Sequence, residues 1–112
     1  ILDQVKFKTG SAQIDAGKDS QDILTAVLGL INAHPEIKTI KVEGHTDNKG
    51  NPAANKKLSG DRAASVVKWL IGKGVDKNKL SSEGFGQDRP IGDNKTDEGR
   101  KENRRVEFHV EM

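Results

Sequence analysis

Residues 42–63 read VEGHTDNKGNPAANKKLSGDRA, the part of the chain richest in polar and turn-forming residues. At its start, Ile40 and Val42 alternate with charged residues, which is the period-two pattern of a strand with one buried face. Gly44 follows and ends the predicted strand. The other elements are predicted relative to this strand and the loop after it.

A helix is predicted from about Pro52. Asn51 can accept a hydrogen bond from an unpaired backbone N–H of the first turn, and proline at the first helical position loses no bond that it needs. Further along, apolar residues recur with the spacing of an amphipathic helix that packs on a sheet. They are Ala63, Val66, Val67, Leu70 and Ile71. Gly60 lies inside this helix, where glycine costs about 1 kcal/mol relative to alanine.

Three polar residues of this stretch could face one ligand. Asp47 follows the carboxyl end of the predicted strand, the edge at which open α/β sheets usually bind ligands, and we expect the loop that carries it to be exposed. Asn55 and Arg62 are seven residues apart and therefore lie two turns from each other on the same side of the helix. Asp47 and Arg62 could form an internal ion pair or be two solvated surface charges. Alternatively, Asp47 binds an ammonium and Arg62 a carboxylate of the same zwitterionic ligand, since the planar guanidinium suits a carboxylate.

The order and spacing of several short motifs resemble the OmpA-like C-terminal domain, a family that includes the peptidoglycan-associated lipoprotein and the stator protein MotB. The resemblance extends over residues 7–110 and does not depend on one motif. The motifs that carry it are Gly44-His45-Thr46-Asp47, Gly50, Asn55, Leu58-Ser59, Arg62-Ala63, Gly84-Phe85-Gly86, Pro90 and Asn103-Arg104-Arg105-Val106.

The resemblance implies non-covalent binding of peptidoglycan through the diaminopimelate of the stem peptide. Asp47 and Arg62 match the two positions that hold the amino-acid head group in this family. Thr46, Asn55 and the backbone near Leu58 would complete the shell around it. The family also brings the loop after the first strand near the ligand, which makes the backbone of Thr9 and Gly10 candidate contacts, although an ordinary connecting loop is the alternative. Arg104 either helps the site electrostatically or pins the preceding loop.

Composition bounds the rest of the prediction. The 112 residues suffice for one domain over residues 1–112, with 32% hydrophobic and 32% charged residues. The net charge of +2 and the lack of aromatic stacking platforms argue against a nucleic-acid partner. There is no cysteine, and no apolar run approaches the roughly twenty residues that span a bilayer. We expect a soluble fragment of a longer exported protein, located in the periplasm of a Gram-negative bacterium and attached to the outer membrane, or to the inner membrane if stator-like, through an anchor elsewhere.

The remaining elements follow from local patterns. We predict a first strand over residues 1–7, and a first helix capped by Asp19 or Ser20 that ends at His34, before Pro35. A third strand is predicted over residues 80–85, a short helical turn around residues 97–101, and a last strand that begins with Asn103 and Arg104. In that strand Val106, Phe108, Val110 and Met112 face the helices, while the other face, with His109, meets water.

The predicted fold is therefore a two-layer α/β sandwich with the order βαβαββ and the helices on one face. The resemblance implies a mixed four-stranded sheet in the order 1-4-2-3, with the last strand antiparallel.

Other chemistries fit the sequence less well. A zinc site needs three or four convergent ligands, and only His45 and Asp47 lie near each other in sequence. No serine lies in a nucleophile elbow, and residues 47–50 lack the regular oxygen ligands of a calcium loop. We therefore predict no enzyme, no metal and no cofactor. The alternatives to a tether between outer membrane and wall are a wall-anchoring domain of a motor-stator or secretion component, and an envelope domain that binds protein partners instead of the wall.

Overall fold

The computed structural model describes residues 2–3 and 18–112. Their elements are, in chain order, β1 (Leu2–Asp3), α1 (Lys18–Ala33), β2 (Thr39–His45), α2 (Pro52–Gly72), the 3-10 helix η1 (Lys77–Lys79), β3 (Leu80–Gly86), α3 (Asp97–Asn103) and β4 (Arg105–Glu111). None of the described helices is long and apolar enough to cross a membrane.

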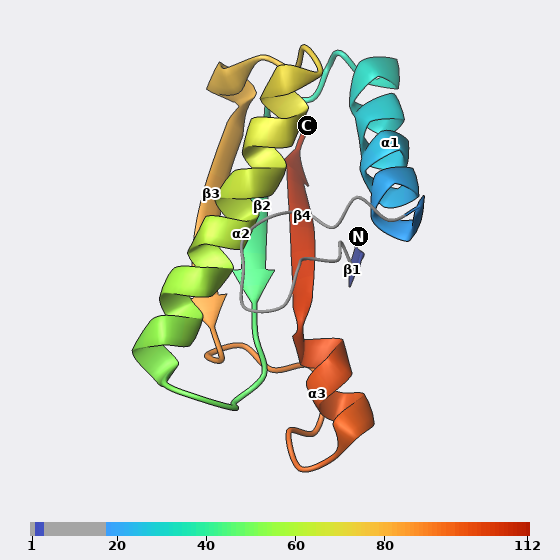
Figure 1. The fold of residues 1–112 in the computed structure, drawn as a ribbon. Coiled ribbons are helices and arrows are strands. Elements are labelled where there is room, and N and C mark those ends of the chain that lie inside the picture. Colours follow the sequence, from blue (N-terminus) through green and yellow to red (C-terminus); the bar gives the residue numbers. More distant parts are fainter. Residues whose placement is uncertain (1, 4–17) are drawn as a thin grey trace.

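The strands form one mixed sheet in the order β1-β4-β2-β3, as predicted (Figure 1). β2 and β3 are parallel, whereas β4 runs antiparallel to both β1 and β2. Of the first predicted strand, over residues 1–7, the structure describes Leu2–Asp3 as β1, and the remainder lies outside the described residues. The predicted fold class is confirmed.

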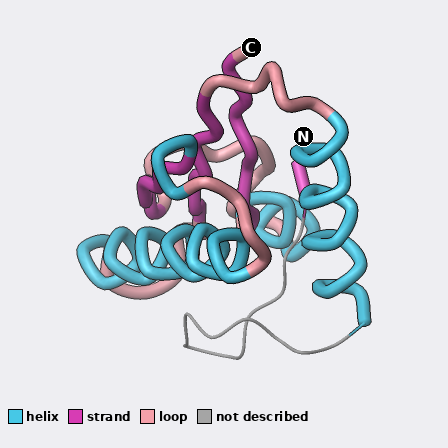
Figure 2. The backbone as a smooth tube through the Cα atoms, turned by 90° about the horizontal axis from the view of Figure 1, so that it is seen from above, coloured by secondary structure: helices cyan, strands magenta, loops and turns pink. Residues whose placement is uncertain are grey.

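Helices α1 and α2 share one hydrophobic core with the inward faces of β2 and β4. Figure 2 shows α2 as a layer beside the strands. Leu24, Val42, Val66 and Leu70 have no exposed surface. Ile71, the last member of the predicted stripe, is instead 40% exposed at the end of α2. The core thus joins both helices to one face of the sheet.

Glycines allow α2 to approach β2 and β3 closely. A Cβ atom on Gly44 would lie 2.1 Å from the carbonyl oxygen of Ser59, and one on Gly84 would lie 2.2 Å from the backbone nitrogen of Gly60. Gly44 therefore does not end β2, which continues to His45. Gly60, costly for the helix by itself, faces Gly84 across this contact. Close approach, rather than turn formation, explains Gly44 and Gly84.

Further element boundaries differ from the predictions. α1 begins at Lys18, so that Asp19 and Ser20 lie in its first turn and do not cap it. β4 begins at Arg105, because Asn103 is the last residue of α3 and Arg104 its C-cap. The predicted helical turn around residues 97–101 is confirmed and extends by two residues. These boundaries depend on tertiary contacts that local patterns do not report.

The face of the sheet opposite α2 is polar but largely buried. Side chains alternate along a strand, and since Gly44 faces α2, Glu43 and His45 point the other way. Arg105 and Glu107 lie on this face as well, with side chains only 4% and 15% exposed. Burial lowers the pKa of His45, and the positive charge of Arg105 lowers it further.

The prediction that this face of β4 meets water is therefore wrong for Arg105 and Glu107, although it is right for His109, which is half-exposed. The prediction that Val110 and Met112 face the helices is also wrong, since these residues are 42% and 60% exposed. Only the first half of β4 lies against the hydrophobic core, through Val106 and Phe108.

Candidate functional site

Asp47 lies two residues beyond the end of β2 and is held on both carboxylate oxygens. Oδ1 accepts a hydrogen bond of 3.0 Å from the backbone N–H of Lys49, and Oδ2 accepts one of 2.6 Å from the Arg104 guanidinium. The residue is only 7% exposed. The prediction that Asp47 sits on an exposed loop is therefore wrong, because these partners draw its side chain inward. The result is a carboxylate fixed in position at the end of β2.

Arg104 provides the positive charge beside Asp47. Its side chain is 48% exposed, whereas that of Asp47 is 11% exposed, so the ion pair lies at the boundary between protein and solvent. As the C-cap of α3, Arg104 is brought next to the β2 loop by the antiparallel pairing of β2 and β4. Of the two roles considered for Arg104, the contact with Asp47 supports the electrostatic one.

Asn103 performs the other role, that of pinning the preceding loop. It is fully buried, and its Oδ1 accepts hydrogen bonds from the backbone N–H groups of Ile91 and Gly92 at 2.7 and 2.8 Å. Its Nδ2 donates to the carbonyl oxygen of Gly92 and to Oδ1 of Asn94. The Asn-Arg pair thus divides into one residue that orders the loop and one that reaches Asp47.

The loop between β2 and α2 is tied down at both ends. Thr46 is buried, and its backbone N–H donates to the carbonyl oxygen of Gly86 on β3. At the other end, Asn51 caps α2 by accepting from the N–H groups of the second and third helical residues, as predicted. Between them, the Asn55 side-chain amide donates a 2.8 Å hydrogen bond to the carbonyl oxygen of Lys49. Asn55 therefore supports the loop that carries Asp47.

Arg62 and Leu58 lie on α2, and both are half-buried. Burial lowers the pKa of Arg62. Arg62 directly precedes the buried Ala63, which faces the core, so its position on the helix is set by packing. The structure brings Thr46, Asp47, Asn55 and Arg104 into one network around the β2 loop, and Arg62 lies on the adjacent helix α2. Thr9 and Gly10 lie outside the described residues.

Ser59 is a positioning residue to which the sequence analysis assigned no role. It is almost fully buried, donates to the carbonyl oxygen of Lys56, and accepts a 2.9 Å hydrogen bond from the backbone N–H of Gly86. The same end of β3 accepts the bond from Thr46 described above. Ser59 therefore connects α2, β3 and the Asp47 loop. Its place in the Leu58-Ser59 motif was the signal in the sequence.

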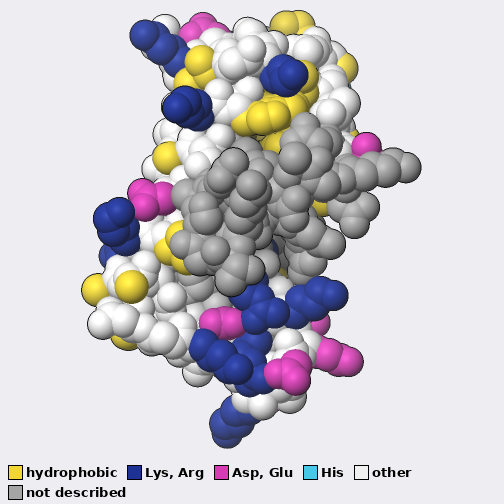
Figure 3. Space-filling model, in the orientation of Figure 1, with side chains coloured by type: hydrophobic (Ala, Val, Ile, Leu, Met, Phe, Trp, Pro, Cys, Tyr) yellow, Lys and Arg dark blue, Asp and Glu magenta, His cyan; other side chains and the backbone are white. Residues whose placement is uncertain are grey.

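The end of the molecule that carries α3 is rich in charge of both signs. Figure 3 shows dark blue and magenta side chains gathered where Figure 1 places α3. A fixed carboxylate next to a guanidinium offers acceptors to an ammonium group and donors to a carboxylate. Such an arrangement suits binding of a zwitterion better than proton transfer.

A family model described as the OmpA family matches residues 6–104 of the chain. Outer membrane protein A of Bordetella avium is 49% identical over 75 residues, which are 67% of this chain and 39% of that protein. The peptidoglycan-binding protein ArfA of Mycobacterium bovis is 38% identical over 89 residues, which are 80% of this chain and 27% of that protein. The chain thus spans well under half of these relatives.

Solved structures agree with the observed topology. The C-terminal domain of Helicobacter pylori MotB superposes with a TM-score of 0.84 at 29% identity, covering 98% of this chain and 84% of that one. The cell wall anchor of the T6SS from Pseudomonas aeruginosa superposes with a TM-score of 0.74 at 31% identity, covering 91% and 71% of the two chains. None of these names describes an enzyme.

Proposed function

The chain belongs to the OmpA family, and on this basis we propose that it binds peptidoglycan non-covalently through the diaminopimelate of the stem peptide. The observation that carries the proposal is the Asp47 carboxylate, held by Lys49 and Arg104 at the end of β2. Asp47 occupies the position that the family resemblance assigns to the amino-acid head group. The names of a peptidoglycan-binding relative and of a cell wall anchor support the same function.

In the proposed complex, Asp47 accepts hydrogen bonds from the diaminopimelate ammonium. Each carboxylate oxygen has two lone pairs, so one acceptor position remains on each after the bonds from Lys49 and Arg104. Arg62 pairs with the carboxylate of the same head group, and its fork of donors matches that geometry. Thr46, Asn55 and the backbone near Leu58 line the head group.

Arg104 contributes to this site through its charge. Its half-exposed guanidinium next to Asp47 attracts a carboxylate that arrives with the ammonium. Thr9 and Gly10 would add backbone contacts. A zwitterionic ligand therefore pairs with both the carboxylate and the guanidinium groups of the site, whereas a simple amine pairs with the carboxylate alone.

The biological role that follows is attachment of a larger envelope protein to the wall in the periplasm. The names of the relatives favour attachment of an outer membrane protein, which would place the anchor in another part of the protein. The likeness to MotB and to a secretion-system anchor favours a second candidate, in which the same wall binding holds a motor or secretion component. Both candidates use one binding chemistry.

Ligand titration followed by NMR tests the proposal. We expect a stem tetrapeptide that carries diaminopimelate to shift the backbone amide signals of residues 46–49 and of Arg62, whereas the same peptide with lysine in that place, which lacks the distal carboxylate, should shift them far less. Affinity for one free ligand should be modest, because a single small head group gives few contacts and many copies on one polymer supply avidity. Equal responses to both ligands would contradict the head-group model and favour an envelope protein partner.

A further inference from the structure

Two motifs of the same form face each other on β2 and β4. Each has a basic residue, a glutamate and a histidine at alternate positions: Lys41-Val42-Glu43-Gly44-His45 and Arg105-Val106-Glu107-Phe108-His109. The antiparallel register pairs Glu43 with Glu107, His45 with Arg105, and Lys41 with His109. Alternate residues share one face, so all six side chains lie on the face opposite α2. Two glutamates directly opposite each other repel unless a positive charge compensates them.

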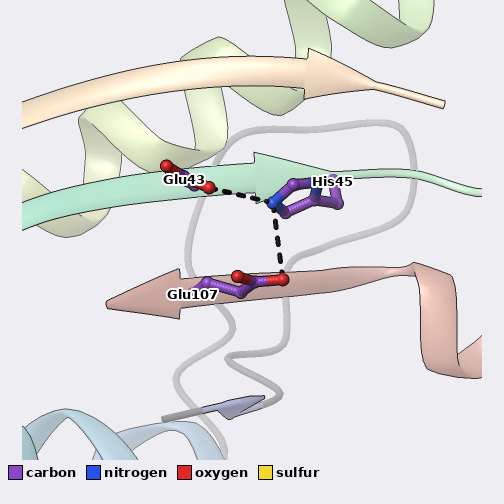
Figure 4. Close-up of side chains that lie close together, drawn as sticks. All are labelled: Glu43, His45 and Glu107. Carbon is purple, nitrogen blue, oxygen red and sulfur yellow. Dashed lines mark ion pairs between the residues drawn. The ribbon is translucent and has the colours of Figure 1, made fainter. Parts of the chain in front are cut away.

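The carboxylates and imidazoles converge in space. His45 Nε2 lies 3.5 Å from Glu43 Oε1 and 3.6 Å from Glu107 Oε2. Dashed lines mark these two ion pairs in Figure 4. His109 Nε2 lies 3.2 Å from Glu43 Oε1 and 2.9 Å from Glu107 Oε1. One potential ligand atom from each of Glu43, His45 and Glu107 lies within 4.8 Å of the others.

His45 is the unusual member of this cluster. Its side chain is 1% exposed, and within the part of the chain that the structure describes neither ring nitrogen has a hydrogen-bond partner. Its distances to the two carboxylates are too long for good hydrogen bonds. An unpaired buried polar group is costly. The imidazole is nevertheless aimed at the glutamates and stacked against Phe85, with ring centroids 5.3 Å apart.

We propose that Glu43, His45, Glu107 and His109 bind a divalent transition-metal ion of the zinc type. Ligands about 2.0–2.2 Å from a tetrahedral zinc ion are separated from one another by about 3.3 Å. Glu43 Oε1 lies near that separation from both imidazoles, 3.5 Å from His45 Nε2 and 3.2 Å from His109 Nε2, and the two imidazoles lie 3.6 and 2.9 Å from separate oxygens of Glu107. A mixture of imidazole and carboxylate ligands favours zinc-type ions over calcium or magnesium, which prefer oxygen ligands alone.

The two basic residues do not occupy the proposed metal position. Arg105 Nε donates to Glu107 Oε2 at 2.5 Å, and Lys41 Nζ lies 3.7 Å from Glu43 Oε2 and 2.5 Å from Glu83. Both glutamates thus turn Oε2 toward a cation and Oε1 toward His109. Outer contacts of this kind orient carboxylate ligands at metal sites.

The ion could enter from the side of His109. This side chain is 52% exposed, whereas Glu43, His45 and Glu107 are 8%, 1% and 15% exposed. The site thus has three protected ligands and one accessible ligand. The sequence analysis did not find it, since His45 and Glu107 are far apart in the sequence and meet only through pairing of β2 with β4.

Calorimetric titration of the tag-free protein with Zn²⁺ in a non-chelating buffer tests the proposal. We expect one saturable site in the wild type and a loss of affinity of about tenfold or more in His109→Gln, whose exposed position makes misfolding avoidable. His34→Gln is the matched control, since His34 also pairs with a glutamate, at 2.8 Å, but on an exposed turn. The control should bind Zn²⁺ like the wild type.

Imidazole nitrogen NMR gives a second readout that needs no substitution at the buried His45. Zn²⁺ should shift Nε2 of His45 and His109 and leave His34 unchanged. Asp47→Asn should keep full Zn²⁺ affinity, because Asp47 lies outside the cluster. Absence of saturable binding in the wild type, wild-type affinity in His109→Gln, or a response at His34 instead of His45 would overturn the proposal.

Discussion

Replacing Gly44 with alanine should destabilise the protein by about 3 kcal/mol, since β2 and α2 approach too closely for a side chain. The new Cβ would lie 2.1 Å from the carbonyl oxygen of Ser59 and 2.8 Å from its carbonyl carbon. Comfortable contact requires about 3.5 Å, so the two elements must separate by about 1.4 Å. The obstacle is helix backbone, which cannot rotate away, and this places the expected cost at the upper end of the range for overpacking.

Gly60→Ala is the matched control at the same helix-sheet contact. Its Cβ would meet the backbone of Gly84 at 3.8 Å, an ordinary contact distance. The helix should therefore gain about 1 kcal/mol from the better propensity of alanine. Urea unfolding followed by circular dichroism measures both changes. A Gly44→Ala variant within 0.5 kcal/mol of wild type (about the scatter of surface substitutions), or a Gly60→Ala variant that is strongly destabilised, would refute the close-approach argument.

Three further substitutions test other parts of the structure by the same unfolding measurement. Asn103→Ala removes four hydrogen bonds from a buried position and should cost about 3 kcal/mol; a cost under 1 kcal/mol would mean that the loop around residues 91–94 is held by something else. Asn51→Ala should cost about 1 kcal/mol through loss of the α2 cap, and Asn51→Ser should restore most of it. Lys57→Ala breaks only an exposed pair with Asp61 and should change stability by less than about 0.5 kcal/mol, so a larger loss would contradict the weight given to burial.

Local patterns predicted those parts of the fold whose determinants are close together in the sequence. The start of α2 followed from Asn51-Pro52, and its buried stripe from residues spaced three and four apart. The sheet order came from the family resemblance, because pairing of distant strands leaves no periodic signal. The same limit explains why α1 starts earlier than expected and why Asn103 belongs to α3.

The contacts within the candidate site could not be predicted from the sequence. Asp47 and Arg104 were both named from the sequence, yet their ion pair joins residues that are adjacent only after β4 has paired with β2. The prediction that Asp47 lies on an exposed loop was wrong for this reason. Similarly, the sequence placed Glu43 on the charged side of the predicted strand and His45 in the loop after it, because only the folded sheet brings Glu107 against them.

Sedimentation with insoluble peptidoglycan of the diaminopimelate type tests the central claim most directly. Wild-type protein should sediment with the wall, and Asp47→Asn and Arg62→Gln should each weaken binding by about tenfold or more while circular dichroism shows an intact fold. Asp61→Asn, which changes an exposed carboxylate next to Arg62 in sequence, is the matched control and should sediment like the wild type. If the folded Asp47→Asn and Arg62→Gln variants sediment as fully as the wild type, the proposed head-group site is wrong.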